Sequence, residues 1–191
     1  MIAELETYQD QVTSITQDAA GLMDGLSDAQ FNWRPGPKRW SMGECFDHLN
    51  ISAKTLFVPG IDAAIADAQS RGLRNPGPFV HPALQRWFLH LSEPPPKMRF
   101  KAPRKVKQKA PRPLTDVRQE FLDWQERIGE RIGLADGLDL RRASHGRLWR
   151  WTLGTYIAVC LAHERRHIWQ ARQVRNEPGF PQGLEPLSAE P

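Results

Sequence analysis

Apolar residues recur at steps of three and four along four separate stretches of this chain, and no other feature constrains its fold as strongly. Such spacing places the apolar side chains on one face of a helix, which must then be buried against a neighbouring element. The sequence shows no strand-like alternation of any length and no internal repeat. It therefore predicts an all-α protein, built as a four-helix bundle. The first stretch runs from Ile2 to about Gly25 and repeats the spacing at Leu5, Tyr8, Val12, Ile15, Ala19, Leu22, Met23 and Leu26.

The second stretch opens with a sharp helix-start signal. Ser41 and Glu44 have the spacing of a capping box, in which the serine hydroxyl accepts from the glutamate amide and the carboxylate reaches back. Trp40, just before the cap, can pack on Cys45 as a hydrophobic staple. We expect this helix to run from Met42 to about Ser70.

A kink or break is expected at Pro59-Gly60 within the second helix, because proline cannot donate a helical hydrogen bond. The two remaining helices are predicted from the same apolar spacing. The third helix is predicted from about Thr115 to Leu134 and the fourth from about Gly154 to Asn176, after a loop around residues 135–153.

Length and composition exclude several classes of protein. With 191 residues the chain can bury a substantial core, and we assign residues 1–191 to a single domain. Its longest apolar run, from Tyr156 to Ala162, is far shorter than the roughly 20 residues that a membrane helix requires. The N-terminal residues do not resemble a secretory signal, and two cysteines cannot form a disulfide framework. We therefore expect a cytoplasmic protein with no membrane association.

The connection between the second and third helices is rich in proline and in basic residues. Residues 71–114 hold nine of the 16 prolines, and only a short helical turn near Trp87 is expected there. The basic segment 97–112 contains no acidic residue; without its eight Lys and Arg residues, 18 basic residues face 22 acidic ones. This segment could gather anions towards a site, although a solvated loop is the simpler interpretation. Nucleic-acid binding is disfavoured because Phe100 is the only aromatic residue there for base stacking.

The fourth predicted helix carries the sequence His163-Glu164-Arg165-Arg166-His167. Histidines four residues apart lie on one helix face, about 6 Å apart along the axis, so both imidazoles can reach one cation. Two ligands are too few for a stable site, and a third must come from elsewhere. Two core histidines, each hydrogen-bonded to a neighbour, are the alternative. Both histidines belong to the apolar face of the predicted helix, so the pair is expected to point into the bundle. The residues of this face recur at steps of three and four: Tyr156, Cys160, His163, His167, Gln170 and Val174.

His48 on the second predicted helix is the candidate third ligand, because it belongs to the inner face two turns past the cap. Three histidines and one open position form a catalytic arrangement rather than a closed structural one. Glu44, Asp47 and Gln170 could orient the ligand rings. Helix capping by Glu44 and solvation of Asp47 are the simpler interpretations.

Nitrogen ligands suit zinc, nickel, copper or ferrous iron. The ligand types alone do not choose among these four metals. Cys45 and Cys160 each precede a proposed ligand by three residues, so one could supply a thiolate, although inert buried thiols are expected. The other histidines, His81, His90 and His145, are expected to be solvated.

The same run also matches the metallopeptidase motif His-Glu-x-x-His. Glu164 would then be the general base, and a third ligand would follow further along the chain. Glu185 is the only acidic candidate at a useful distance, and it lies in a tail rich in proline and glycine. No strand precedes the motif to bind an extended peptide, so this function is less favoured.

Several of these motifs occur together in one known family. Trp40-Ser41-x-x-Glu44-x-x-x-His48-Leu49, followed by His163-x-x-x-His167-x-x-Gln170, resembles the DinB-like (DinB/YfiT) superfamily, whose members are regarded as metal-dependent enzymes. The resemblance covers nearly the whole chain and includes Phe31-x-Trp33-x-Pro35. It implies an up-up-down-down bundle that holds a divalent ion through His48, His163 and His167. The ion that it implies is zinc or nickel, with iron or manganese as alternatives. The long basic insertion departs from the family and leaves the substrate class open.

The resemblance also implies an activity. Better-understood relatives transfer or rearrange substrates with low-molecular-weight thiols such as bacillithiol or mycothiol. We therefore expect a metal-dependent enzyme acting on a small molecule, as a thiol-dependent S-transferase or isomerase or as a hydrolase, with such a thiol as co-substrate. A metal-stabilised bundle without turnover, acting as a binding or stress-response module, is the alternative. Bundles of this kind often pair through exposed helix faces, so a homodimer is the oligomer to consider.

Overall fold

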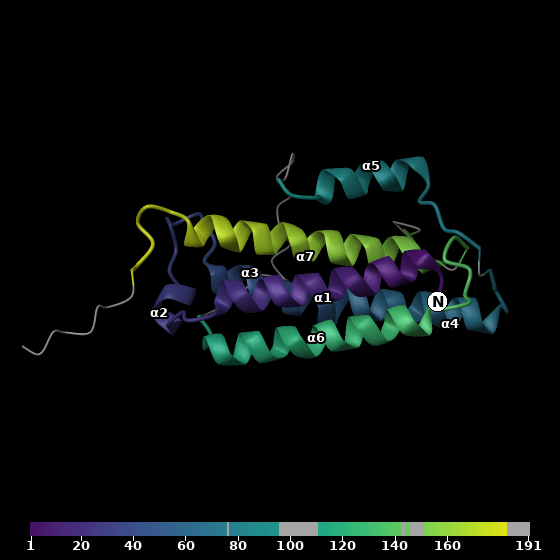
Figure 1. The fold of residues 1–191 in the computed structure, drawn as a ribbon, viewed down its shortest axis with the longest axis horizontal. Helices are drawn as coiled ribbons and strands as arrows, with labels where there is room; N and C mark the ends of the chain where they lie inside the picture. Colours follow the sequence, from purple (N-terminus) through teal and green to yellow (C-terminus); the bar gives the residue numbers. More distant parts are fainter. Residues whose placement is uncertain (76, 96–110, 143, 146–150, 183–191) are drawn as a thin grey trace, which may run out of the picture.

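Four long helical segments lie side by side in the computed structural model of this chain, which describes residues 1–75, 77–95, 111–142, 144–145 and 151–182 (Figure 1). The chain is mostly helical, as the apolar spacing predicted, and the inward faces share one core of buried apolar side chains. The segments are α1 (Ala3–Met23), the run α3 (Met42–Ser52), η1 (Ala53–Phe57) and α4 (Val58–Ser70), then α6 (Leu114–Leu134) and α7 (Leu153–Arg175).

Short elements connect the long helices. α2 (Asp28–Phe31) follows α1 and has its own capping box between Ser27 and Gln30. α5 (Ala83–Ser92), where only a turn was expected, lies against α7 outside the four long segments (Figure 1). β1 (Ser144–His145) and β2 (Trp151–Thr152) form a two-residue antiparallel pair that leads into α7. Among the described helices, none is both long and apolar enough to cross a membrane.

The chain runs in one direction through α1 and α7 and in the opposite direction through α3 and α6 (Figure 1). Asp28, just after α1, accepts from the amide of Leu114 at the start of α6, and Arg175 at the end of α7 donates to the carbonyl of Leu22 near the end of α1. The helices therefore do not follow the expected up-up-down-down order. An up-up start needs a connection that crosses the length of the molecule, whereas α2 and its flanking turns return the chain at the same end. The long crossover lies instead in residues 71–113, between α4 and α6.

α3 begins where the sequence predicts, and the irregularity near Pro59 takes an unexpected form. Oγ of Ser41 accepts from the amide of Glu44 at 3.0 Å, and Oε2 of Glu44 accepts from the amide of Ser41 at 2.9 Å. In place of a break at Pro59-Gly60, the helix widens into the π-helical turn η1, which ends at Phe57. Pro59 has no amide to donate and its ring crowds the carbonyl one turn earlier, and a wider turn accommodates both constraints.

Candidate metal centre

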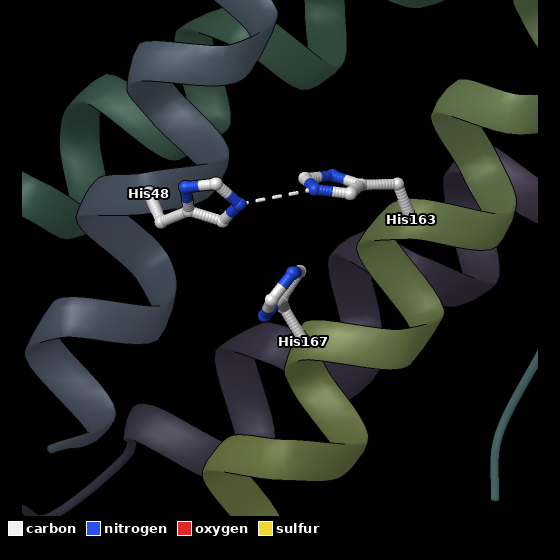
Figure 2. Close-up of side chains that lie close together, drawn as sticks. All are labelled: His48, His163 and His167. Carbon is white, nitrogen blue, oxygen red and sulfur yellow. Dashed lines mark hydrogen bonds between the residues drawn. The ribbon is translucent and has the colours of Figure 1, made fainter. Parts of the chain in front are cut away.

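Three histidines from two helices meet between α3 and α7 (Figure 2). His48 projects from α3, and His163 and His167 project from successive turns of α7. One ring nitrogen of each lies within 4.8 Å of the others, and Nε2 of His48 is 3.1 Å from Nε2 of His163. The ring centroids are 4.6 to 5.0 Å apart. Side chains 115 positions apart in the sequence thus share one point in the fold.

Local sequence explains this convergence. The capping box fixes where α3 begins and so sets which of its residues face inward; His48, six residues past the first helical position, is buried at 5% exposure. His163 and His167 are one helical turn apart and so share a face of α7. Because α3 packs directly against α7, the two faces bring their imidazoles together.

Aromatic side chains line the histidine cluster. The ring of Trp40 lies edge to face on His48, with centroids 5.1 Å apart, and stacks on His167 at 5.7 Å. Phe57, the last residue of η1, packs against His163 with centroids 5.2 Å apart. From the sequence we expected Trp40 only as a helix staple and did not single out Phe57. The tryptophan directly before the cap was a usable signal, whereas the position of Phe57 depends on the π-turn.

The two imidazoles of α7 are held in their neutral form. Burial lowers the pKa of His163 well below its usual 6.5, and the neighbouring His167, His48 and Arg166 lower it further. Burial also lowers the pKa of His167 to about 3; His48 and Arg166 add to this effect, and the hydrogen bond with Gln170 opposes it. A neutral imidazole keeps the lone pair that a metal ion requires.

The cluster fits a divalent ion. Zinc–nitrogen bonds of about 2.0–2.1 Å in a tetrahedral arrangement place the nitrogens about 3.4 Å apart, close to the 3.1 Å between Nε2 of His48 and Nε2 of His163. Two nitrogen lone pairs this close repel each other unless a proton or a cation lies between them. Nδ1 of His163 is buried with no hydrogen-bond partner in the described part of the chain, so this ring lacks the support that usually orients a ligand.

The three predicted orienting residues have different partners. Oε1 of Gln170 is 3.1 Å from Nδ1 of His167, so Gln170 directly contacts the cluster. Glu44 caps α3, and its oxygens also accept from Nε and Nη2 of Arg34 at 2.8 and 2.6 Å. Asp47, expected to be solvated, is buried, and its Oδ1 accepts from Nη1 of Arg112 at 2.6 Å. Glu44 and Asp47 therefore hold α3 and the segments that carry Arg34 and Arg112 in position rather than orient the histidine rings.

Glu164, the candidate base of the peptidase interpretation, is buried against α6. Its Oε1 accepts from Nε2 of Gln125 at 2.8 Å, and burial raises its pKa from 4.5 to about 7. Glu185, the third ligand of that interpretation, lies outside the described residues, as do basic residues 97–109. The contacts of Glu164 thus do not favour a peptidase.

The other candidate residues stand apart from the cluster. Cys45 and Cys160 are fully buried, and burial raises the pKa of both thiols, so each stays protonated. His81, expected to be solvated, is half-buried: its Nε2 lies 3.0 Å from the hydroxyl of Tyr8, and its Nδ1 lies 3.4 Å from Oγ1 of Thr155. His90 is exposed on α5, as expected, and His145 lies in β1, its side chain outside the described part of the chain.

Fold and site together define a mostly helical protein whose facing helices bring together three histidines that could hold a metal ion. The sequence profile of the DinB superfamily matches residues 11–171, and the chain belongs to this superfamily. No curated protein and no solved structure matches it significantly.

Proposed function

We propose that this protein binds a divalent metal ion through His48, His163 and His167 and is a metal-dependent enzyme acting on a small molecule. The observation that carries the proposal is the convergence of three imidazoles, two of them held neutral by burial, between α3 and α7. Membership of the DinB superfamily supports it. Nitrogen ligands suit zinc, nickel, copper or ferrous iron, and the family resemblance favours zinc or nickel, with iron or manganese as alternatives.

Three protein ligands leave at least one coordination position for another molecule. A divalent ion in such a site lowers the pKa of a coordinated water or thiol towards neutrality and polarises a carbonyl group. The residues of this chain prepare the site: Gln170 orients the ring of His167, and Trp40 and Phe57 pack against the histidine rings and shield part of them from water.

The reaction class that fits best is thiol-dependent S-transfer or isomerisation, with hydrolysis as the second choice. A low-molecular-weight thiol would be the co-substrate, because a divalent ion with an open position lowers the pKa of a bound thiol as it does that of a bound water. We further propose that residues 1–191 form a single four-helix-bundle domain of a cytoplasmic protein and that its oligomer is a homodimer.

Elemental analysis of the purified protein tests the metal site. Wild-type protein should hold about one divalent ion per chain, and His48→Ala should lose most of it. His90→Ala is the matched control, because His90 lies exposed on α5, and this variant should keep its metal. Undiminished metal in His48→Ala, or a wild-type chain that takes up no ion on reconstitution, would contradict the proposal.

A further inference from the structure

One face of α5 is apolar and exposed. Leu84 and Trp87, which lie one helical turn apart and so share that face, are 72% and 58% exposed. Val80, just before the helix, is 64% exposed. These residues are three of the six large apolar side chains that are exposed in the described part of the chain, and they lie within eight positions of one another. Large apolar side chains that gather on a water-facing surface mark a contact with another protein or with a membrane.

The other side of α5 already has its partner within this chain. The helix packs against α7, and the ring of Phe88 lies on Trp151 with centroids 5.8 Å apart. Just past the C-terminal end of α5, Glu93 forms a two-pronged ion pair with Arg165 of α7. These contacts hold α5 at the edge of the molecule, outside the four long helical segments (Figure 1). The exposed apolar face is therefore free to meet a flat surface.

The connection that carries α5 is strongly basic. Residues 71–115 hold eleven Lys and Arg residues and one acidic residue, Glu93, whereas the rest of the chain holds 15 basic and 21 acidic residues. The charge of Glu93 is balanced by its ion pair with Arg165. On the helix itself, Arg86 is exposed next to Trp87. The apolar face thus belongs to a part of the chain with a large positive charge.

This combination of side chains fits the surface of an anionic membrane. Leucine and tryptophan side chains enter the boundary between lipid headgroups and acyl chains, and basic residues are attracted to the anionic headgroups. A second copy of this chain fits less well, because two α5 faces packed on each other would bring like charges together. A single-stranded nucleic acid also fits less well, because Val80 and Leu84 offer no ring on which a base could stack.

We propose that the exposed face of α5, formed by Val80, Leu84, Arg86 and Trp87, binds the surface of a membrane that contains anionic lipids. The helix lies along the membrane, and the binding is reversible because the apolar surface that it inserts is small. Such binding needs no spanning segment. It replaces our expectation of no membrane association, which rested on the short apolar runs of the sequence.

Co-sedimentation of the purified full chain with lipid vesicles tests the proposal. The wild type should bind vesicles of phosphatidylcholine mixed with phosphatidylglycerol at least about tenfold more tightly than vesicles of phosphatidylcholine alone, since each basic residue near an anionic surface adds about fivefold. Added salt should weaken the binding, because it screens these charges. A wild type that does not bind the mixed vesicles, or that binds both kinds equally, would overturn the proposal.

Variants of exposed residues test whether α5 makes the contact. The double variant Leu84→Ser/Trp87→Ser should lose about tenfold or more in affinity for the mixed vesicles, because it removes two inserted apolar side chains. Leu84→Ser alone should lose less, and Arg86→Gln should lose about fivefold. Leu134→Ser is the matched control and should bind as the wild type does. Leu134 is 58% exposed, as Trp87 is, and it ends α6, on the far side of the molecule from α5 (Figure 1).

Two outcomes with the double variant would contradict the proposal. Circular dichroism first establishes that the variant is folded. Vesicle binding equal to that of the wild type would show that α5 is not the contact. A wild-type dimer in analytical ultracentrifugation that becomes a monomer in Leu84→Ser/Trp87→Ser would show that a second copy of the chain, rather than a membrane, covers this face.

Discussion

The carboxamide of Gln170 selects the tautomer of His167. With the carbonyl oxygen of Gln170 3.1 Å from Nδ1, the neutral imidazole carries its proton on that nitrogen, because a carbonyl oxygen can only accept. Nε2 is then the ring nitrogen with the available lone pair. A single side chain on the same helix thereby prepares one ligand before any ion binds.

Removing this contact should weaken metal binding. Gln170→Ala is expected to lose about tenfold or more in metal affinity, the usual effect of removing a residue that orients a metal-binding histidine. Gln170→Glu keeps an acceptor at the same place and should retain the affinity. Competition titrations against a chromophoric chelator measure both variants, and equal affinities of Gln170→Ala and the wild type would show that His167 does not depend on this contact.

Glu164 makes the stability of the protein depend on pH. Burial raises its pKa from 4.5 to about 7, against the hydrogen bond from Gln125 and the charge of Arg165, which lower it. The folded state therefore holds this proton more tightly than the unfolded state, and the free energy of unfolding falls as the pH rises from about 4.5 to about 7. His167, with its pKa lowered to about 3, acts in the opposite sense between about pH 3 and pH 6.5.

Glu164→Gln separates the two effects, because the amide is neutral at every pH and His167 is unchanged. The variant should be more stable than the wild type by an amount that grows between pH 4.5 and pH 7.5, reaching on the order of 3 kcal/mol. Urea unfolding of the metal-free proteins across this range measures the difference. Parallel profiles for the two proteins would mean that Glu164 ionises in the folded state as it does in the unfolded chain.

The role of a residue can be predicted from the sequence when its contact partners lie close to it in the chain. The spacing of His163 and His167 and the position of His48 behind its cap are local features, and these three residues could be singled out. The partner of Asp47 is Arg112, which lies 65 positions further along the chain, and no local sequence pattern predicts such a pair. Asp47 was therefore expected to be solvated, although it is buried.

At the scale of the elements, helix bounds follow closely from local signals. α6 and α7 each begin one residue before the predicted start, because apolar spacing and helix-stopping residues lie within a few positions of each boundary. The form of the irregularity at Pro59 could not be predicted in the same way. Whether a helix breaks, bends or widens before a proline depends on how the next segment packs, here α4 against α7.

Gly60 allows that close packing. A Cβ atom at this position would lie 2.5 Å from Cε1 of the buried ring of Tyr156. Gly60→Ala should therefore lower the free energy of unfolding by about 1–3 kcal/mol, although alanine favours helix by up to about 1 kcal/mol over glycine. Gly21→Ala in α1, where no atom lies within 4 Å, should instead be mildly stabilising. Urea unfolding compares the two variants, and a stabilised Gly60→Ala would show that α4 does not approach Tyr156 so closely.

The topology of the whole molecule places the histidine cluster. Apolar spacing specifies which face of a helix is buried but not the direction in which the helix runs. That direction is fixed by contacts between helix ends, such as Asp28 with Leu114 and Arg175 with Leu22, which join residues 86 and 153 positions apart. The expected up-up-down-down order came from the family resemblance rather than from the residues, whereas the pairing of α3 with α7 followed once their histidines were taken as partners.

Because the proposed ligands join α3 to α7, metal binding should stabilise the whole fold rather than one helix. A ligand that binds only the folded state at 100 times its dissociation constant adds about 2.7 kcal/mol, which for a chain of this size corresponds to a rise in Tm of about 5–10 °C. Calorimetry at fixed free metal should show this rise in the wild type and in His90→Ala but not in His48→Ala. If His48→Ala gains as much as the wild type, the two histidines of α7 bind the ion without α3, and the metal does not link the two helices.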